Sequence, residues 1–386
     1  MNTLNNVVIN KLSGGLGRRN PEQDMTSGLL FDGISTEKLE TNKVERLSSL
    51  EDAEAFGITE ENDNAQVSVY YQIQQFFRMN PSGDLYIMKT EGPAYGEIVR
   101  KALTMQEKAN GDIRQMAIIY SSQSSFEETL EAVAKAQTQA DLAYQNFMPF
   151  EIILEGKGFN PATASSLDGL NAANVSVVVA MDAKQAVKYP NSAAVGLVLG
   201  ALSKAKVSEN IAWIEKFNLT GEGFSKPAFI GGKKIETLGD LATLNDKRYI
   251  FTQTHTGLAG VYFNDSHTCT TGTSDFAYVE NNRTINKATR LLRTALLPKL
   301  ASPVLVDIDG KLPQSVSKSF EGLCRSALEG MVANQEVSSF DVYVDPKQNI
   351  LATSELKVKA EITPIGTARK IMVDLGFKNP FGIDKA

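Results

Sequence analysis

The chain has 386 residues, of which 42% are hydrophobic and 22% charged, proportions typical of a globular protein and unlike those of a disordered, collagen-like or long coiled-coil chain. Its formal net charge is −6 at pH 7, whereas nucleic-acid-binding proteins usually carry a basic excess. No apolar run approaches the ~18 residues that a membrane-spanning helix needs, and MNTLNNVVINK lacks the pattern of a signal peptide. We therefore expect a soluble cytoplasmic protein that binds no nucleic acid and inserts into no membrane.

The N-terminal sequence predicts an arm rather than a packed element. A short β-like run, Val7-Val8-Ile9, is followed by GGLGRRNPEQD (14–24), which has glycine, proline and charge but no periodicity. A second β-like patch lies at 29–31. A short helix is then expected after Ser49, whose hydroxyl can cap it, with Gly57 closing it.

Between residues 85 and 205, short β-branched runs alternate with long helical segments. The strand candidates are nearly continuous apolar runs, which is typical of strands covered on both faces by helices. We therefore predict a mainly parallel sheet with flanking helices. The expected strands are 86–89, 116–120, 150–156 and 175–182, and the expected helices are 96–109, 126–145 and 193–205.

The C-terminal part predicts a separate α+β module. A glycine- and threonine-rich stretch (209–273) precedes two strongly amphipathic helices, one over 285–296 and one over about 315–334. Two segments, SFDVYVD (339–345) and LKVKAEI (356–362), then alternate with period two, as half-exposed strands do.

Motifs for chemistry are sought without success. No strand exit carries the glycine pattern of a dinucleotide site, and no P-loop is found, so no cofactor is expected. One polar segment, DSHTCTTGTSD (265–275), holds candidates for a triad or zinc site, but its spacing favours a polar turn or loop. We therefore predict no catalytic residue and no metal site. The candidates in that segment are Asp265, His267, Cys269, Ser274 and Asp275.

Single residues elsewhere have simpler interpretations. Cys324 lies beside an apolar helix face and is expected to be a buried hydrophobe. Trp213 fits either a core or an interface position. Opposite the apolar arc of the first amphipathic helix, Arg283, Lys287 and Arg290 form a basic stripe. This stripe is either a solvated helix face or a docking face for an acidic protein partner.

Three segments carry a resemblance to a known family. They are ERLSSLEDAEAFGI (45–58), TSDFAYVENNRTINKATRLLRTAL (273–296), and SFEGLCRSALEGMVANQEVSSFDVYVDP (319–346) with the alternating strand after it. In these segments the sequence resembles the sheath proteins of contractile phage tails, tail-like bacteriocins and injection systems. The resemblance implies a structural, non-enzymatic subunit that stacks as six-fold rings around an inner tube and contracts to drive the tube through a target envelope.

The same resemblance implies partners, a domain plan and a location. The partners are further copies of the chain, an inner tube protein, and baseplate and tail terminator proteins. We expect an N-terminal arm (1–28), an α/β body (29–272), a polymerisation module (273–352) and a C-terminal arm (353–386). Assembly is expected in the cytoplasm, and the finished subunit in the tail or contractile particle.

Two groups of residues are expected to make its contacts. The expected tube-facing residues are Arg283, Lys287, Arg290, Lys318 and Arg325. Strands that leave the subunit and pair with its neighbours are expected to involve Val7, Val8, Ile9, Phe340, Val342, Val344, Leu356, Val358, Ala360 and Ile362. The alternatives are an α/β oxidoreductase or hydrolase with a scattered site, or another structural part of the same particle. A tube protein fits less well because tube proteins are mostly β and shorter.

Overall fold

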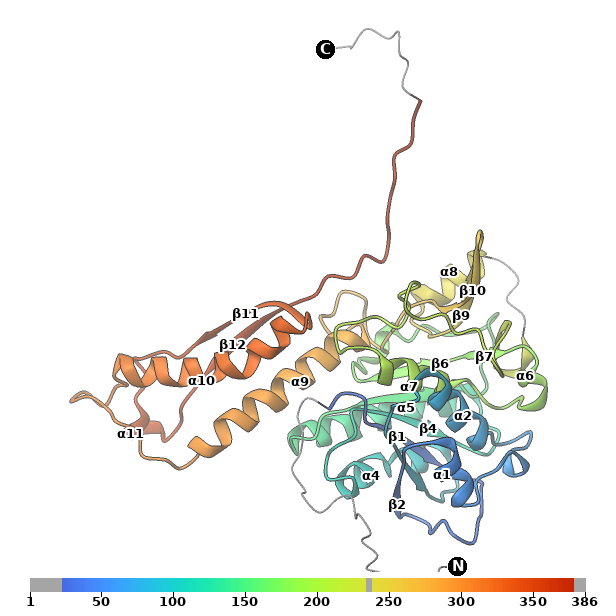
Figure 1. Cartoon of the computed structure of the whole chain (residues 1–386), viewed down its shortest axis with the longest axis horizontal. Helices are drawn as coiled ribbons and strands as arrows, with labels where there is room; N and C mark the ends of the chain where they lie inside the picture. The colour runs from blue at the N-terminus through green and yellow to red at the C-terminus, as the bar shows by residue number, and fades with distance from the viewer. Residues whose placement is uncertain (1–22, 234–237, 378–386) are drawn as a thin grey trace, which may run out of the picture.

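The computed structural model describes residues 23–233 and 238–377. A six-stranded sheet forms the centre of the body, with the strand order β2-β3-β1-β4-β5-β6 (Figure 1). Neighbouring strands are parallel except for the β2–β3 pair. Every residue of four strands is buried, which confirms the predicted mainly parallel sheet. The strands are β1 (Ser27–Phe31), β2 (Val44–Leu47), β3 (Leu85–Lys89), β4 (Gln115–Ile119), β5 (Glu151–Glu155) and β6 (Val175–Val178).

Two groups of helices cover this sheet. α5 packs on β5 and β6 and has α3 and α4 beside it, while α7 packs on β4 and β5 and contacts α2. Together with the sheet they form the main hydrophobic core. The helices are α2 (Val69–Met79), α3 (Tyr95–Val99), α4 (Ala102–Lys108), α5 (Phe126–Gln145) and α7 (Val195–Lys204).

Shorter elements complete the body. Ser49 caps α1 in a capping box with Asp52, and Gly57 follows with a φ of 84°, both as the sequence predicts. β7 leaves the main sheet and pairs antiparallel with β8, and β9 pairs antiparallel with β10. These elements are α1 (Leu50–Ala55), η1 (Glu60–Asn62), η2 (Asp168–Leu170), β7 (Ala180–Asp182), α6 (Gln185–Lys188), β8 (Pro227–Phe229), η3 (Ile230–Gly232), α8 (Leu238–Asp246), β9 (Thr252–His255) and β10 (Leu258–Phe263).

The C-terminal module projects from the body as a helix pair with a two-stranded hairpin (Figure 1). Helix α9 belongs to both parts, because its first half is buried against the body and its second half packs on α10. The module has its own small core, built around Leu291, Cys324 and Leu328. Its elements are α9 (Val279–Leu296), η4 (Leu297–Lys299), α10 (Gln314–Ala333), β11 (Val337–Tyr343), α11 (Ile350–Thr353) and β12 (Lys359–Pro364).

Beyond β12 the chain runs away from the module as an extended tail (Figure 1). The tail passes the body and continues outward, so the last described residues lie far from both parts. At the other end, β1 already begins at Ser27, so two residues assigned to the predicted N-terminal arm belong to the sheet.

Candidate functional site: the hairpin and the roots of both arms

The hairpin of the module has one apolar face, and the chain covers that face itself. β11 and β12 pair antiparallel, with Phe340 opposite Ile362 and Val342 opposite Ala360. Val342 is buried, and Phe340, Ala360 and Ile362 pack on the same small core as α9 and α10. Val358 joins this core as well.

In the isolated subunit the segment from 356 onward therefore differs from the expectation over β12, which pairs within its own chain. Its apolar side matches the face that α9 and α10 present, so the strand is satisfied within its own chain. Of the other expected strand residues, Val344 is buried and Leu356 is partly exposed. Val7, Val8 and Ile9 lie outside the described residues.

The hairpin nevertheless has open edges. Among residues 23–233 and 238–377, β11 and β12 form a sheet of two strands only, so each strand has one edge without a strand beside it. An unpaired strand edge presents backbone N–H and C=O groups that can pair with another chain. The hairpin thus has two edges at which a further strand can pair.

The tail has the matching pattern. Ile371, Val373, Leu375 and Phe377 recur at every second position, which puts them on one side of an extended strand. Each of these four side chains is at least 78% exposed. Residues 371–377 are called the tail strand below. In the described subunit this extended segment forms no strand, and its apolar side has no cover.

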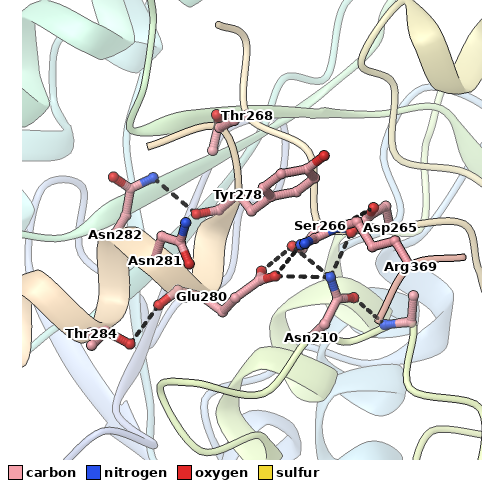
Figure 2. A network of polar contacts seen from close by, with 12 residues as sticks. Asn210, Asp265, Ser266, Thr268, Tyr278, Glu280, Asn281, Asn282, Thr284 and Arg369 are labelled. Atoms are coloured by element: carbon pink, nitrogen blue, oxygen red, sulfur yellow. Dashed lines mark hydrogen bonds and ion pairs between the residues drawn. The ribbon is translucent and has the colours of Figure 1, made fainter. Parts of the chain in front are cut away.

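Among the described residues of the tail, Arg369 is the one that forms ion pairs with the body. Its guanidinium binds Asp265 (Nε to Oδ2, 2.9 Å) and also Glu280 in the first turn of α9. It lies over the ring of Tyr278, 3.4 Å from the ring centre. Figure 2 shows Asp265 and Glu280 converging with Ser266 and Asn210 beside Arg369. We call this group the C-terminal clamp.

Both carboxylates of the C-terminal clamp are buried and depend on its donors. Asn210 donates from Nδ2 to Asp265 and to Glu280, and the Ser266 hydroxyl donates to Glu280. Burial raises the pKa of Glu280, while the hydrogen bond from Ser266 and the charge of Arg369 oppose that rise. Arg369 therefore supplies the positive charge beside two neighbouring buried carboxylates.

Asp24, at the base of the N-terminal arm, is also held by ion pairs, but here a carboxylate lies among basic side chains. The carboxylate of Asp24 accepts hydrogen bonds from Lys287 (Nζ to Oδ2, 2.6 Å) and Arg290 (Nη2 to Oδ1, 2.9 Å) of α9. Arg283 donates to the Asp24 carbonyl at 3.4 Å, and Lys287 also binds Glu336 at 2.7 Å. We call these five residues the N-terminal clamp.

This arrangement corrects the interpretation of the basic stripe. Arg283 and Lys287 are each only 3% exposed, and burial lowers the pKa of Arg290 to about 9. In the subunit the stripe is therefore buried and ion-paired, and it is not a solvated helix face. Such cations can be buried because Asp24 and Glu336 supply counter-charges.

Lys318 and Arg325 of α10 lie on the surface. Their side chains are 63% and 42% exposed, and they pair with Glu321 and Asp341. That Lys318 and Arg325 face a tube stays a prediction.

The first half of the polar segment 265–275 is buried in the body. His267 is buried, its Nε2 lies 2.9 Å from Asn245 Oδ1, and burial lowers its pKa to about 4. Cys269 is fully buried, and its backbone forms an isolated antiparallel β-bridge with Ala172. Burial raises the pKa of its thiol to about 12. Both groups are thus kept uncharged at neutral pH, which suits packing better than nucleophilic chemistry.

Cys324 is buried, as the sequence predicts, while Trp213 is 46% exposed and therefore no core residue. Trp213 lines a cavity of about 1220 Å³ together with Tyr278 and Arg369. Within the described parts of the chain, no group of three or more His, Cys, Asp or Glu residues could hold a metal ion. The same residues include no helix long and apolar enough to span a membrane.

Comparison with known families places the sequence. Residues 4–267 match the N-terminal domain of DUF2586, and residues 275–382 match its C-terminal domain. The chain belongs to the DUF2586 family. No curated protein matches it.

Solved structures show which fold this DUF2586 chain has. It is similar over 98% of its length to a chain of the six-fold symmetrised anti-feeding prophage baseplate (13% identity, all of that chain covered, TM-score 0.66). It is also similar over 98% of its length to the contracted anti-feeding prophage helical sheath (14% identity, 100% of that chain, TM-score 0.65).

A third match is the contracted PVC sheath complex of an extracellular contractile injection system (12% identity, 98% of both chains, TM-score 0.64). The fold is that of contractile sheath proteins, which are structural subunits in the assemblies named. The resemblance seen in the sequence is confirmed at this level.

Proposed function

We propose that this DUF2586 chain is the sheath subunit of a contractile particle. Its copies stack as six-fold rings around an inner tube, and the resulting sleeve contracts to drive the tube through a target envelope. The proposal is supported by the sheath fold over 98% of the chain. The observation that carries it is that one subunit has both a hairpin with open edges and a separate, exposed apolar tail strand.

Neighbouring subunits are joined by strand addition. The tail strand of one copy adds to an open edge of the β11–β12 hairpin of a second copy, where main-chain hydrogen bonds give affinity and alternate side chains set the register. The N-terminal run Val7-Val8-Ile9 supplies a strand for the other edge. A donor segment that differs from its receptor makes a head-to-tail contact, which builds an open helical array.

The other partners follow from this role. The sleeve surrounds an inner tube protein and ends at baseplate and terminator proteins. Subunits assemble in the cytoplasm before they become part of the particle. Lys318 and Arg325 are the exposed cations of α10 that we assign to the tube contact. The sheath role needs neither cofactor nor catalytic residue.

Negative-stain electron microscopy of the purified protein tests the proposal, with long hollow cylinders expected. Val373→Asp puts a charge on the apolar side of the tail strand and should abolish the cylinders. Met372→Asp adds the same charge at an equally exposed position (78% for each residue) on the other side and should preserve them. Thermal unfolding should be the same for both variants, because neither side chain packs on its own subunit.

A chain ended after Pro364 should keep its hairpin and remain unassembled. A sharp monomer or dimer of the unaltered protein at high concentration in sedimentation velocity contradicts the proposal. Normal cylinders from Val373→Asp contradict strand addition by the tail.

A further inference from the structure

Helix α9 contacts the roots of both arms. Glu280 in its first turn binds Arg369 of the C-terminal arm, and Lys287 and Arg290 bind Asp24 of the N-terminal arm. Residues 280 and 290 are separated by about 15 Å along a helix, at 1.5 Å per residue. The two arms therefore begin at neighbouring points on one rigid element, although they are the two ends of the sequence.

The two clamps are charge-complementary. The C-terminal clamp surrounds one guanidinium with two carboxylates, whereas the N-terminal clamp surrounds Asp24 with three basic side chains. One of these, Lys287, also pairs with Glu336. Glu280, Arg283 and Lys287 are all at most 4% exposed. Removing either arm root leaves buried charges without their counter-ions, which is strongly unfavourable. Each root is therefore held by electrostatics as well as by the chain.

The positions of the two clamps also determine which elements bear a force that is applied to an arm. β12 ends at Pro364 in the projecting module, and only five positions later Arg369 returns the chain to the body. A pull on the tail strand thus reaches α9 through Arg369 before it reaches the hairpin. A pull on the N-terminal arm likewise reaches α9 through Asp24 before it reaches β1, which begins at Ser27.

We infer that α9 is a strut that carries tension from one arm to the other, with the Asp24 and Arg369 ion pairs as its attachment points. The strut shields the hairpin, because a two-stranded sheet pulled from one end of one strand separates pair by pair. The inference rests on the proposed function, since tension arises only if both arms bind neighbouring subunits.

The attachment itself is testable in the dilute, unassembled chain. Spin labels are placed on Ile371→Cys and Glu131→Cys, both exposed positions, while the two native cysteines are buried. A narrow distance distribution is expected with Arg369 present and a broad one with Arg369→Gln. Lys188→Gln, which removes an exposed ion pair of the body, is the control and should leave the distribution narrow. A broad distribution in the unaltered protein, or no broadening with Arg369→Gln, overturns the attachment.

The strut is tested by stretching single tubes between optically trapped beads. Arg369→Gln and Asp24→Asn should each lower the rupture force. The double variant should rupture at about the force of the weaker single variant, because attachments in series fail at the weaker one. Two independent fasteners would give additive losses. Arg369→Lys keeps the charge but loses the two-pronged geometry, and should give an intermediate force.

The outcomes separate the two proposals. Tubes of normal strength from both single variants, or additive losses in the double variant, overturn the strut and leave the sheath role intact. An unaltered protein that forms no tubes overturns the sheath role and the strut together.

Discussion

A carboxyl group buried between the sheet and α9 makes the stability of the body depend on pH. Glu151, the first residue of β5, is 1% exposed. Its Oε1 accepts hydrogen bonds from Asn174 at 3.0 Å and Asn286 at 2.8 Å, and its Oε2 has no hydrogen-bond partner among the described residues. Burial raises the pKa of Glu151 to about 8 despite those two hydrogen bonds.

The folded protein therefore holds the proton of Glu151 more tightly than the unfolded chain, in which the pKa of this carboxyl group is 4.5. The contribution of Glu151 to the free energy of unfolding should be full below pH 4.5 and should fall by ~1.4 kcal/mol per pH unit as the pH rises towards about 8. Glu151→Gln should remove this dependence, making the variant more stable than the unaltered protein at pH 8, with a much smaller difference at pH 5.

Urea unfolding at the two pH values measures the effect. Glu107→Gln, an exposed carboxylate on α4, is the control and should change neither value. An equal effect of Glu151→Gln at pH 5 and pH 8 would show that Glu151 does not titrate in this interval.

At the same scale, the sequence identifies charged residues but not their partners. Helical periodicity correctly separates Arg283, Lys287 and Arg290 from the apolar arc of α9. It cannot show that Asp24, 263 positions before Lys287, comes to meet them. Arg369 likewise has no sequence signal, because a lone arginine in a polar tail looks solvated until a buried Glu280 requires a cation.

At the scale of elements, two glycines let α7 lie directly against α2. A Cβ atom at Gly196 would come within 2.1 Å of the Gln72 carbonyl oxygen, and one at Gly200 within 2.7 Å of the Phe76 carbonyl oxygen. The Gln72 side chain also accepts a hydrogen bond from the Gly196 N–H at 2.7 Å. The contact is made by backbone, so a rotamer change cannot relieve it.

Gly196→Ala should therefore destabilise the body by at least about 1–3 kcal/mol through overpacking. The matched control is Gly322→Ala on α10, where an added Cβ has no neighbour within 4 Å. This control should instead stabilise the chain by roughly 0.5–1 kcal/mol, because alanine restricts the unfolded state and favours helix. Chemical denaturation of the two variants measures the sign of each change in the free energy of unfolding. An unchanged free energy of unfolding for Gly196→Ala would contradict the close approach of α7 and α2.

Elements with one dominant period were predictable. The strands β3, β4 and β5 and the helices α5, α7 and α10 lie within a few residues of their expected places. β2 was missed because VERL is too short to show a period. α2 was overlooked although its sequence carries the signal, since Val69, Ile73, Phe76 and Phe77 recur at the i, i+4, i+7, i+8 spacing of an amphipathic helix. The run 175–182 looked like one strand but divides into β6 and β7, because its end pairs with β8 instead. Periodicity showed that LKVKAEI needs cover but not that its own chain provides it.

At the scale of the whole molecule, the tube contact is expected to be weak and repeated. Exposed ion pairs contribute only ~0–1 kcal/mol each, but every ring repeats them. Replacing Lys318 and Arg325 together with glutamine should lower co-sedimentation of the subunit with isolated tubes, and more so at low salt. Replacing Lys204 and Lys226, two exposed lysines of the body, changes the net charge equally and should have no effect. Equal binding by both double variants would remove α10 from the tube contact.

In the proposed sleeve, the extended tail of each subunit would make the two ends of the assembly different. Because the donor strand and the receptor hairpin are different parts of each subunit, a stack cannot be the same at its two ends. If tail strands join successive rings as proposed, one terminal ring presents hairpins with unfilled edges, and the other presents tail strands whose apolar sides are bare. A protein that closes the first end must offer an extended strand, and one that closes the second must offer a sheet edge. In the proposed sleeve, the polarity of the particle thus follows from the structure of a single subunit. The proteins that close its two ends could not replace each other.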